Sequence, residues 1–266
     1  MKQDQLDRFK RWFEDYAGRF YGDDDYVNAH LRLKQEHTER TCQEIRLLAE
    51  ALTLDADQTR IAELIALFHD IGRFPQFVKY RTYSDPKSVD HGQLGVHVLR
   101  EEGILATLRR EEKQWVETAI ELHGRKALPP NLRGRTLLLT KLIRDADKID
   151  ILRVVLNNYK GYREKPDAFL LEIELPDEPE YSPDVLEALF NEERIDYRKL
   201  KTLNDMKLCQ LGWVYDLNFT ASLKRIDECG FLPELFTFLP QDDAIQQVCR
   251  KIQNDVAARL AQNCQP

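Results

Sequence analysis

The sequence is poor in the features that mark several common protein classes. Its five cysteines form no CxxC pair, so neither a zinc ribbon nor a disulfide framework is expected, and scattered thiols are typical of a reducing compartment. Glycine and proline number only 11 each and lie mostly between apolar-periodic segments, which favours helices over a strand-rich sandwich. No GxxxxGK(S/T), GxGxxG or GxSxG pattern occurs. A phosphate-binding loop, a Rossmann site and a nucleophile elbow are therefore not supported.

Long apolar runs and concentrated basic stretches are also missing. The longest apolar runs, such as Leu64–Phe68, are too short to span a bilayer, and Met1 to Phe13 carry no apolar core like that of a signal peptide. The net charge is −7, whereas binding a nucleic-acid backbone needs a concentrated Lys/Arg surface. We therefore expect a cytoplasmic protein with no membrane association and no stable nucleic-acid binding.

Apolar residues recur every three to four positions along most of the 266 residues, which predicts an all-α protein. The first expected helices cover residues 4–20, 25–51, 57–71, 90–103, 111–124 and 136–160. Asp55 or Asp57 is expected to cap the third of them. Residues 72–89 mix Gly, Pro, Ser and Asp with basic and aromatic residues, so they are expected to form a long functional loop.

The composition changes at residues 161–183, which are rich in Pro and Glu. We therefore expect a helical core over residues 1–160 and a helical extension over residues 161–266 that packs on it. Phe169–Leu175 is expected to be a short strand or irregular, and further helices are expected over 184–212, 213–229 and 241–262. The aromatic residues of the extension carry no catalytic pattern; they are expected to form helical core, and a homodimer surface is the alternative.

The histidines are confined to one part of the chain. All six lie between residues 30 and 123, and residues 124–266 contain none. Such clustering predicts a shared site. The strongest local signal is the adjacent pair His69-Asp70, at the end of an apolar helix and just before Gly72. Neutral imidazoles suit Mn, Fe, Co, Ni or Zn, and carboxylates suit hard cations such as Mg, so this chemistry indicates a divalent metal site.

Five segments in this order resemble the HD superfamily of metal-dependent phosphohydrolases. They are EHTERT at 36–41, LFHDIGRF at 67–74, DHGQLGVHVL at 90–99, AIELHG at 119–124 and IRDADKIDIL at 143–152. The resemblance covers about residues 25–160. It implies a helical core in which the first His, the His-Asp pair and a distant Asp hold a divalent metal. Those roles fall on His37, His69, Asp70 and Asp147.

Three acidic residues compete for the last of these positions. Asp147 lies four residues after Ile143 of the apolar face, so it can point inward, and the family pattern also favours an Asp between Ala and a basic residue. Asp150 is expected to help orient a ligand, as is Glu36, which adjoins His37. Asp145 is expected to face solvent.

His91 and His123 match the extra His positions of HD proteins with two metals, which implies a binuclear centre bridged by Asp70. A general acid that protonates the leaving group is the alternative role for His91, and a structural core histidine is the alternative for both. We therefore expect one or two divalent ions, with Mn, Fe, Co, Ni, Zn and Mg not distinguished. His97 is expected to face elsewhere, and His30 to border the site or be structural.

Basic residues near these ligands are expected to bind a substrate phosphate, because Arg offers paired donors and Lys a point charge. The candidates are Lys34, Arg73 and Lys148. The candidate catalytic residues are Asp70, His91 and Arg73.

The leading hypothesis is hydrolysis of a small phosphomonoester or phosphodiester, for example a nucleotide, by metal-activated water. Two alternatives use the same ligands. One is an HD-type di-iron oxygenase, which would contain iron and consume oxygen. The other is a non-catalytic regulatory module, which would bind metal tightly without turnover.

Overall fold

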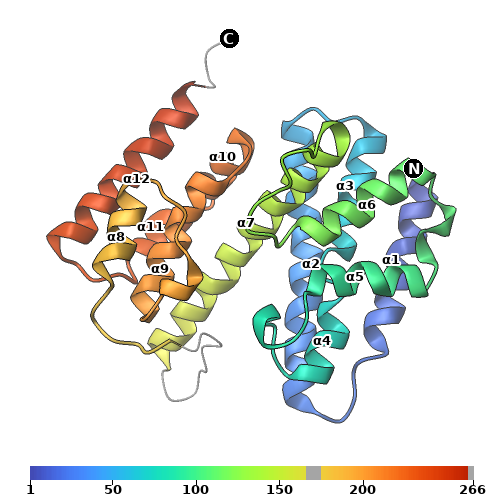
Figure 1. Cartoon of the computed structure of the whole chain (residues 1–266), viewed down its shortest axis with the longest axis horizontal. Coiled ribbons are helices and arrows are strands. Elements are labelled where there is room, and N and C mark those ends of the chain that lie inside the picture. The colour runs from blue at the N-terminus through green and yellow to red at the C-terminus, as the bar shows by residue number, and fades with distance from the viewer. Residues whose placement is uncertain (166–174, 263–266) are drawn as a thin grey trace. The chain divides into compact units, whose positions relative to one another are not determined.

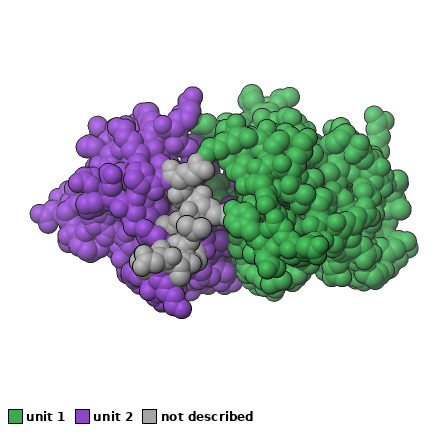
Figure 2. Space-filling view, turned by 90° about the horizontal axis from the view of Figure 1, so that it is seen from below, with its two compact units in different colours: residues 1–150 green, residues 151–266 purple. Residues whose placement is uncertain are grey.

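The computed structural model describes residues 1–165 and 175–262, so the expectation for Phe169–Leu175 lies outside the described residues except at Leu175. Within these ranges the regular structure is helical and contains no strand (Figure 1), and the all-α prediction is confirmed. The chain divides into two compact units, residues 1–150 and 151–266 (Figure 2). The division falls inside helix α7 (Gly134–Glu164), whereas the division expected from the sequence lies between residues 160 and 161.

Unit 1 is built around one helix whose C-terminal part is completely buried. Its helices are α1 (Gln3–Gly18), α2 (Asp25–Ala51), α3 (Ala56–Phe68), α4 (Arg73–Tyr80), α5 (His91–Glu101), α6 (Arg110–Leu122) and the first part of α7. Every residue of α3 from Ile61 to Phe68 is buried, and α1, α2 and α6 pack against this helix. The rings of Phe9 and Trp12 on α1 meet Phe68 edge-on, a favoured geometry for aromatic pairs. The His-Asp pair directly follows this central helix.

Aspartate side chains begin three of the helices that carry the site. Asp24 accepts a hydrogen bond from the backbone N–H of Val27 and so caps α2. Asp55, and not Asp57, caps α3 in a reciprocal capping box with Gln58. Asp90 caps α5 by accepting a hydrogen bond from the backbone N–H of Gln93. The expected helices of unit 1 therefore begin within two residues of their observed starts.

The prediction of a long loop over residues 72–89 is wrong. The segment contains α4 (Arg73–Tyr80) and a short 3-10 helix η1 (Asp85–Lys87). Pro75 suggests a break, but it occupies the first turn of α4, where its missing N–H has no intrahelical partner to lose. Phe74 and Phe77 bury one face of the helix against the core. Only residues 81–90 remain largely irregular.

Unit 2 is helical but more interrupted than expected. Its other helices are α8 (Pro183–Phe190), α9 (Leu203–Leu211), α10 (Thr220–Glu228), α11 (Phe231–Phe236) and α12 (Asp243–Gln262), with 3-10 helices η3 (Tyr197–Lys199) and η4 (Gly212–Asp216). A single helix over 184–212 is wrong, because the chain turns at Glu192, whose φ is +61°. The fully buried carboxylate of Asp205 then accepts hydrogen bonds from the backbone of Lys201 and Thr202, which begins α9. No helix within the described ranges is long and apolar enough to cross a membrane.

Candidate metal centre

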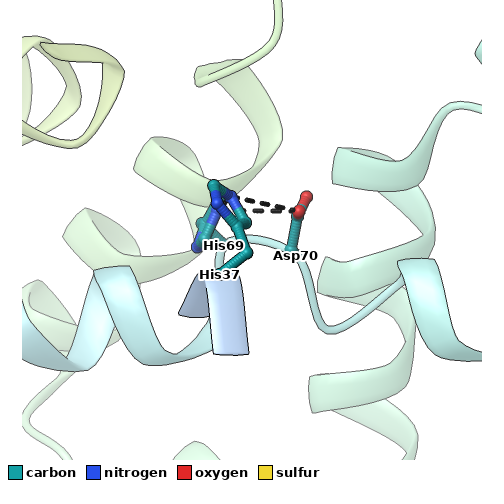
Figure 3. Close-up of side chains that lie close together, drawn as sticks. All are labelled: His37, His69 and Asp70. Carbon is teal, nitrogen blue, oxygen red and sulfur yellow. Dashed lines mark hydrogen bonds and ion pairs between the residues drawn. The ribbon is translucent and has the colours of Figure 1, made fainter. Parts of the chain in front are cut away.

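Five elements of unit 1 bring the six expected ligand residues together. His37 lies in the middle of α2, His91 is the first residue of α5, and Asp147 lies on α7. His69 and His123 are the C-cap residues of α3 and α6. Asp70 follows His69 in the turn before α4, and Figure 3 shows it facing the imidazoles of His37 and His69. All four histidines and Asp70 are buried.

Four of these residues surround one point, here called subsite one. The Nε2 atoms of His37 and His69 are 3.2 Å apart, and both lie 3.7 Å from Oδ2 of Asp70. Oδ1 of Asp147 lies 3.1 Å from Nε2 of His37 and 3.6 Å from Nε2 of His69. Ligands about 2.1 Å from a common ion, at angles between octahedral and tetrahedral, lie roughly 3.0–3.5 Å from one another. The spacing in subsite one is close to this range.

The other oxygen of Asp70 belongs to a second cluster, here called subsite two. Oδ1 of Asp70 lies 3.6 Å from Nε2 of His91 and 3.8 Å from Nε2 of His123, and these two nitrogens are 3.0 Å apart. Each of the two carboxylate oxygens of Asp70 thus faces a different set of imidazoles. This is the arrangement that a carboxylate bridging two cations requires.

Hydrogen bonds on the far side of each ring fix all four imidazoles in one tautomer. Nδ1 of His69 donates to the carbonyl of Ala66, and Nδ1 of His123 donates to that of Ile120, each at 2.7 Å. A carbonyl can only accept, so Nδ1 carries the proton. Nδ1 of His37 faces a carboxylate oxygen of Asp150 at 2.8 Å, and Nδ1 of His91 faces one of Asp85 at 2.6 Å. In its neutral form each ring therefore presents the lone pair of Nε2 to the centre.

The consequence is that lone pairs oppose one another across each subsite. Nε2 of His37 faces Nε2 of His69, and Nε2 of His91 faces Nε2 of His123, at 3.2 and 3.0 Å. Two neutral acceptors repel at this distance unless a cation lies between them. A shared proton would link only the two nitrogens of a pair, whereas an oxygen of Asp70 also faces both nitrogens in each subsite. The residues therefore fit a divalent metal ion in each subsite.

The charges of the centre hold its carboxylates ionised. Burial opposes ionisation of Asp70, but Lys34 and the neighbouring imidazoles outweigh it and lower the pKa of Asp70 well below its usual value. Burial likewise opposes ionisation of Asp147, but the adjacent imidazoles of His37 and His69 outweigh it and lower the pKa of that carboxyl well below its usual value. Burial, with the charge of Arg73, lowers the pKa of His91 to about 4. Burial and Lys34 lower the pKa of His37, but the carboxylates of Asp147 and Asp150 outweigh them and raise it. The carboxylates and His91 are thus in the protonation states that metal binding needs, and a bound ion would displace a proton from His37.

A partly buried ion pair supports His37 from behind. The carboxylate of Asp150 is fully buried and accepts hydrogen bonds from Nε of Arg40 at 2.7 Å as well as from His37. Burial raises the pKa of Asp150, but these two partners outweigh burial and keep it below its usual value. Asp150 thus takes the orienting role that the sequence suggested for it. Glu36 is half exposed and lies 3.8 Å from Arg40, and Asp145 is buried and does not face solvent.

Replacing Asp150 by Asn is expected to weaken metal binding at subsite one by about 10–100-fold, the usual effect of removing a partner that orients a ligand histidine. The hydrogen bonds from His37 and Arg40 use both carboxylate oxygens of Asp150, and the NH2 group of Asn, which is a donor, cannot replace either oxygen as an acceptor. Titration with Mn²⁺ measures the effect. Glu36→Gln is the matched control, because Glu36 also pairs with Arg40 but touches no imidazole. Equal affinities for Asp150→Asn and Glu36→Gln would contradict the orienting role.

Two of the three expected phosphate-binding residues adjoin Asp70. Nζ of Lys34 lies 2.7 Å from Oδ2 of Asp70, and Nε of Arg73 lies 3.4 Å from Oδ1. Nη1 of Arg73 donates to Gln76, to the carbonyl of Tyr83 and to Asp85, while its Nη2 has no hydrogen-bond partner among the described residues. Lys148 follows Asp147 on α7 and is partly buried. Lys34 and one edge of Arg73 are therefore placed to meet an anion.

The remaining two histidines lie outside both subsites. His30 stacks on Phe77 with ring centroids 4.3 Å apart, and its Nδ1 faces the carbonyl of Tyr26. His97 is exposed and lies 3.3 Å from Glu101, one turn along α5. The sequence reasoning missed Asp85, which faces His91, and Arg40, which pairs with Asp150. Nothing in their local pattern distinguishes these two residues from surface charges.

Comparison with known proteins agrees with this geometry. The family model of the HD domain matches residues 35–152, a range that contains all six ligand residues. Residues 35–152 are therefore similar to the HD domain, and they contain a His/Asp cluster compatible with divalent metal binding. No curated protein and no solved structure matches the chain.

Proposed function

We propose that this chain is a metal-dependent phosphohydrolase that cleaves a small phosphomonoester or phosphodiester, with a nucleotide as one candidate substrate. The observation that carries the proposal is the position of Asp70 between two pairs of opposed Nε2 lone pairs, one oxygen toward each pair. His37, His69, Asp70 and Asp147 would hold one ion, and Asp70, His91 and His123 a second. A bound divalent ion supplies an activated water and offsets negative charge on phosphate.

The cations beside the centre favour an anionic substrate. In the described structure Lys34 is paired with Asp70, and only 17% of its side chain is exposed. Once one divalent ion balances the carboxylates of Asp70 and Asp147, the ammonium of Lys34 needs another counter-charge. A phosphoryl oxygen supplies it, and the unpartnered Nη2 edge of Arg73 can contact a second oxygen. Lys34 and Arg73 therefore bind and orient the phosphoryl group in this proposal.

The surroundings of His91 favour a ligand role over that of a general acid. Its Nδ1 proton is directed away from the centre, to Asp85, and its Nε2 carries no proton in the neutral ring. Because burial lowers the pKa of His91 to about 4, the ring is neutral near pH 7 and has no acidic proton to offer a leaving group. We therefore assign His91 to subsite two.

Phosphate release tests the proposal directly. The chain is incubated with nucleotides, cyclic nucleotides and sugar phosphates, each with Mn²⁺, Mg²⁺, Co²⁺, Ni²⁺, Zn²⁺ or Fe²⁺ added to metal-free protein. We expect release that depends on the added metal. Stoichiometric iron with oxygen consumption would instead support an oxygenase. Tight metal binding without turnover of any ester in the panel would support a regulatory module.

Replacing Lys34 by Gln is expected to lower kcat/KM on the best substrate of that panel by about 10–100-fold, because a charge-assisted hydrogen bond contributes roughly 1.5–3 kcal/mol. Binding of Mn²⁺ should persist, since Lys34 is not a ligand. Lys79→Gln is the control. Lys79 on α4 lies over the ring of Tyr80, just as Lys34 lies over the ring of Tyr83, but Lys34 also pairs with Asp70. A Lys34→Gln enzyme with the kcat/KM of Lys79→Gln would refute the role of Lys34 in substrate binding.

A further inference from the structure

The imidazole of His91 is supported differently from the other three imidazoles of the centre. His69 and His123 donate to carbonyls three residues earlier on their own helices, so forming α3 and α6 suffices to orient them. His37 donates to Asp150, whose carboxylate is fully buried. His91 donates to Asp85, whose side chain is 31% exposed and belongs to the largely irregular segment 81–90. The orientation of His91 therefore depends on where this segment lies.

Polar side chains of α4 hold the segment in place. The amide nitrogen of Gln76, a fully buried residue, lies 2.9 Å from Oδ1 of Asp85, from Oγ of Ser88 and from the carbonyl of Val89. Nη1 of Arg73 reaches the same Oδ1 of Asp85 at 2.9 Å. One oxygen of Asp85 is thus fixed by α4, which leaves the other to receive the Nδ1 proton of His91 at 2.6 Å.

We propose that Asp85 is a positioning residue that determines whether subsite two binds its metal ion. The carboxylate transmits the position of segment 81–90 to His91, and so to one of the three ligands of that subsite. Without Asp85 the ring can rotate about its side-chain bonds, and its Nε2 lone pair no longer faces that of His123. Subsite one contains none of these contacts, so its ligands keep their geometry. This inference rests on the proposed function in that it uses the same two subsites.

Metal binding without any substrate is the test. Metal-free wild type, Asp85→Ala, Asp85→Asn and Asp90→Asn are titrated with Mn²⁺, and bound ions are counted by equilibrium dialysis. Electron paramagnetic resonance then reports whether two ions are spin-coupled through a bridge. Asp90 is the matched control, because it lies in the same segment and its carboxylate caps α5, whereas the imidazole of His91 donates to Asp85. Asn caps a helix as well as Asp does.

We expect wild type and Asp90→Asn to bind two Mn²⁺ ions with a spin-coupled signal. Asp85→Ala should bind the first ion normally and the second about 10–100-fold more weakly, with the coupled signal lost at stoichiometric metal. Asp85→Asn should recover part of the second affinity, since its amide oxygen still accepts from His91. Wild-type binding of both ions by Asp85→Ala, equal weakening of both, or a single ion in wild type would overturn the inference.

The same samples separate this inference from the proposed function. If wild type binds two ions and Asp85→Ala loses the second, but no phosphate ester is hydrolysed, only the proposed reaction fails. If wild type hydrolyses a phosphate ester and Asp85→Ala keeps two tightly bound, coupled ions, only the role of Asp85 fails. Circular dichroism confirms that each variant is folded before either result is interpreted.

Discussion

Replacing Asp70 by Asn is expected to lower the rate of phosphate release by about 1000-fold or more, on whichever ester the wild-type chain hydrolyses. Both oxygens of Asp70 face imidazole pairs, and the amide of Asn leaves only one oxygen for the two subsites. Metal-assisted stabilisation of the transition state contributes several kcal/mol, and each 1.36 kcal/mol is a tenfold change in rate. The rate is measured at saturating Mn²⁺ and compared with wild type.

Two controls make the result for Asp70→Asn specific. Asp4→Asn makes the same chemical change on the exposed surface of α1, and it should leave the rate unchanged. Bound Mn²⁺, counted after dialysis, should fall in Asp70→Asn and not in Asp4→Asn. A folded Asp70→Asn protein with wild-type turnover would show that the proposed centre does not perform the reaction.

The helical framework could be predicted from sequence because it follows from local patterns. Apolar spacing is enough to locate α2, α3 and α5, and one of the two caps expected for α3, Asp55, is the observed one. Pro75 shows the limit of this reasoning, since the same residue breaks a helix interior and is tolerated in a first turn. Which of the two applies at α4 depends on the burial of Phe74 and Phe77, a tertiary effect.

The centre required information beyond local pattern. His37 and Asp147 are remote in sequence, and only the resemblance to HD proteins related them before the structure placed their ligand atoms 3.1 Å apart. The residues that orient the ligands from behind were harder still to predict from the sequence. Asp85 has no periodicity or motif of its own, because its role arises from the fold of segment 81–90 against α4. Contacts of this kind depend on tertiary geometry that residue spacing does not encode.

The turn that carries the His-Asp pair also packs closely against the helix that carries His91. A Cβ atom added at Gly72 would lie 2.3 Å from the carbonyl oxygen of His91 and 2.7 Å from the backbone nitrogen of Gly95. Both neighbours are backbone atoms of α5, which cannot move aside as a flexible side chain can. Only glycine therefore allows α5 to approach Asp70 closely enough to form subsite two.

Replacing Gly72 by Ala is accordingly expected to destabilise the protein by about 3 kcal/mol, the upper part of the range for overpacking, and to lower the melting temperature by roughly 6 °C or more. Because the new methyl group presses on the carbonyl of His91, the second Mn²⁺ should also bind more weakly. Calorimetry and Mn²⁺ titration measure the two effects.

Gly18→Ala on α1 is the control, since a Cβ there meets nothing within 4 Å and alanine favours helix. If Gly72→Ala melts at the temperature of Gly18→Ala and binds two ions, then close packing of α5 on the His-Asp turn is not what forms subsite two.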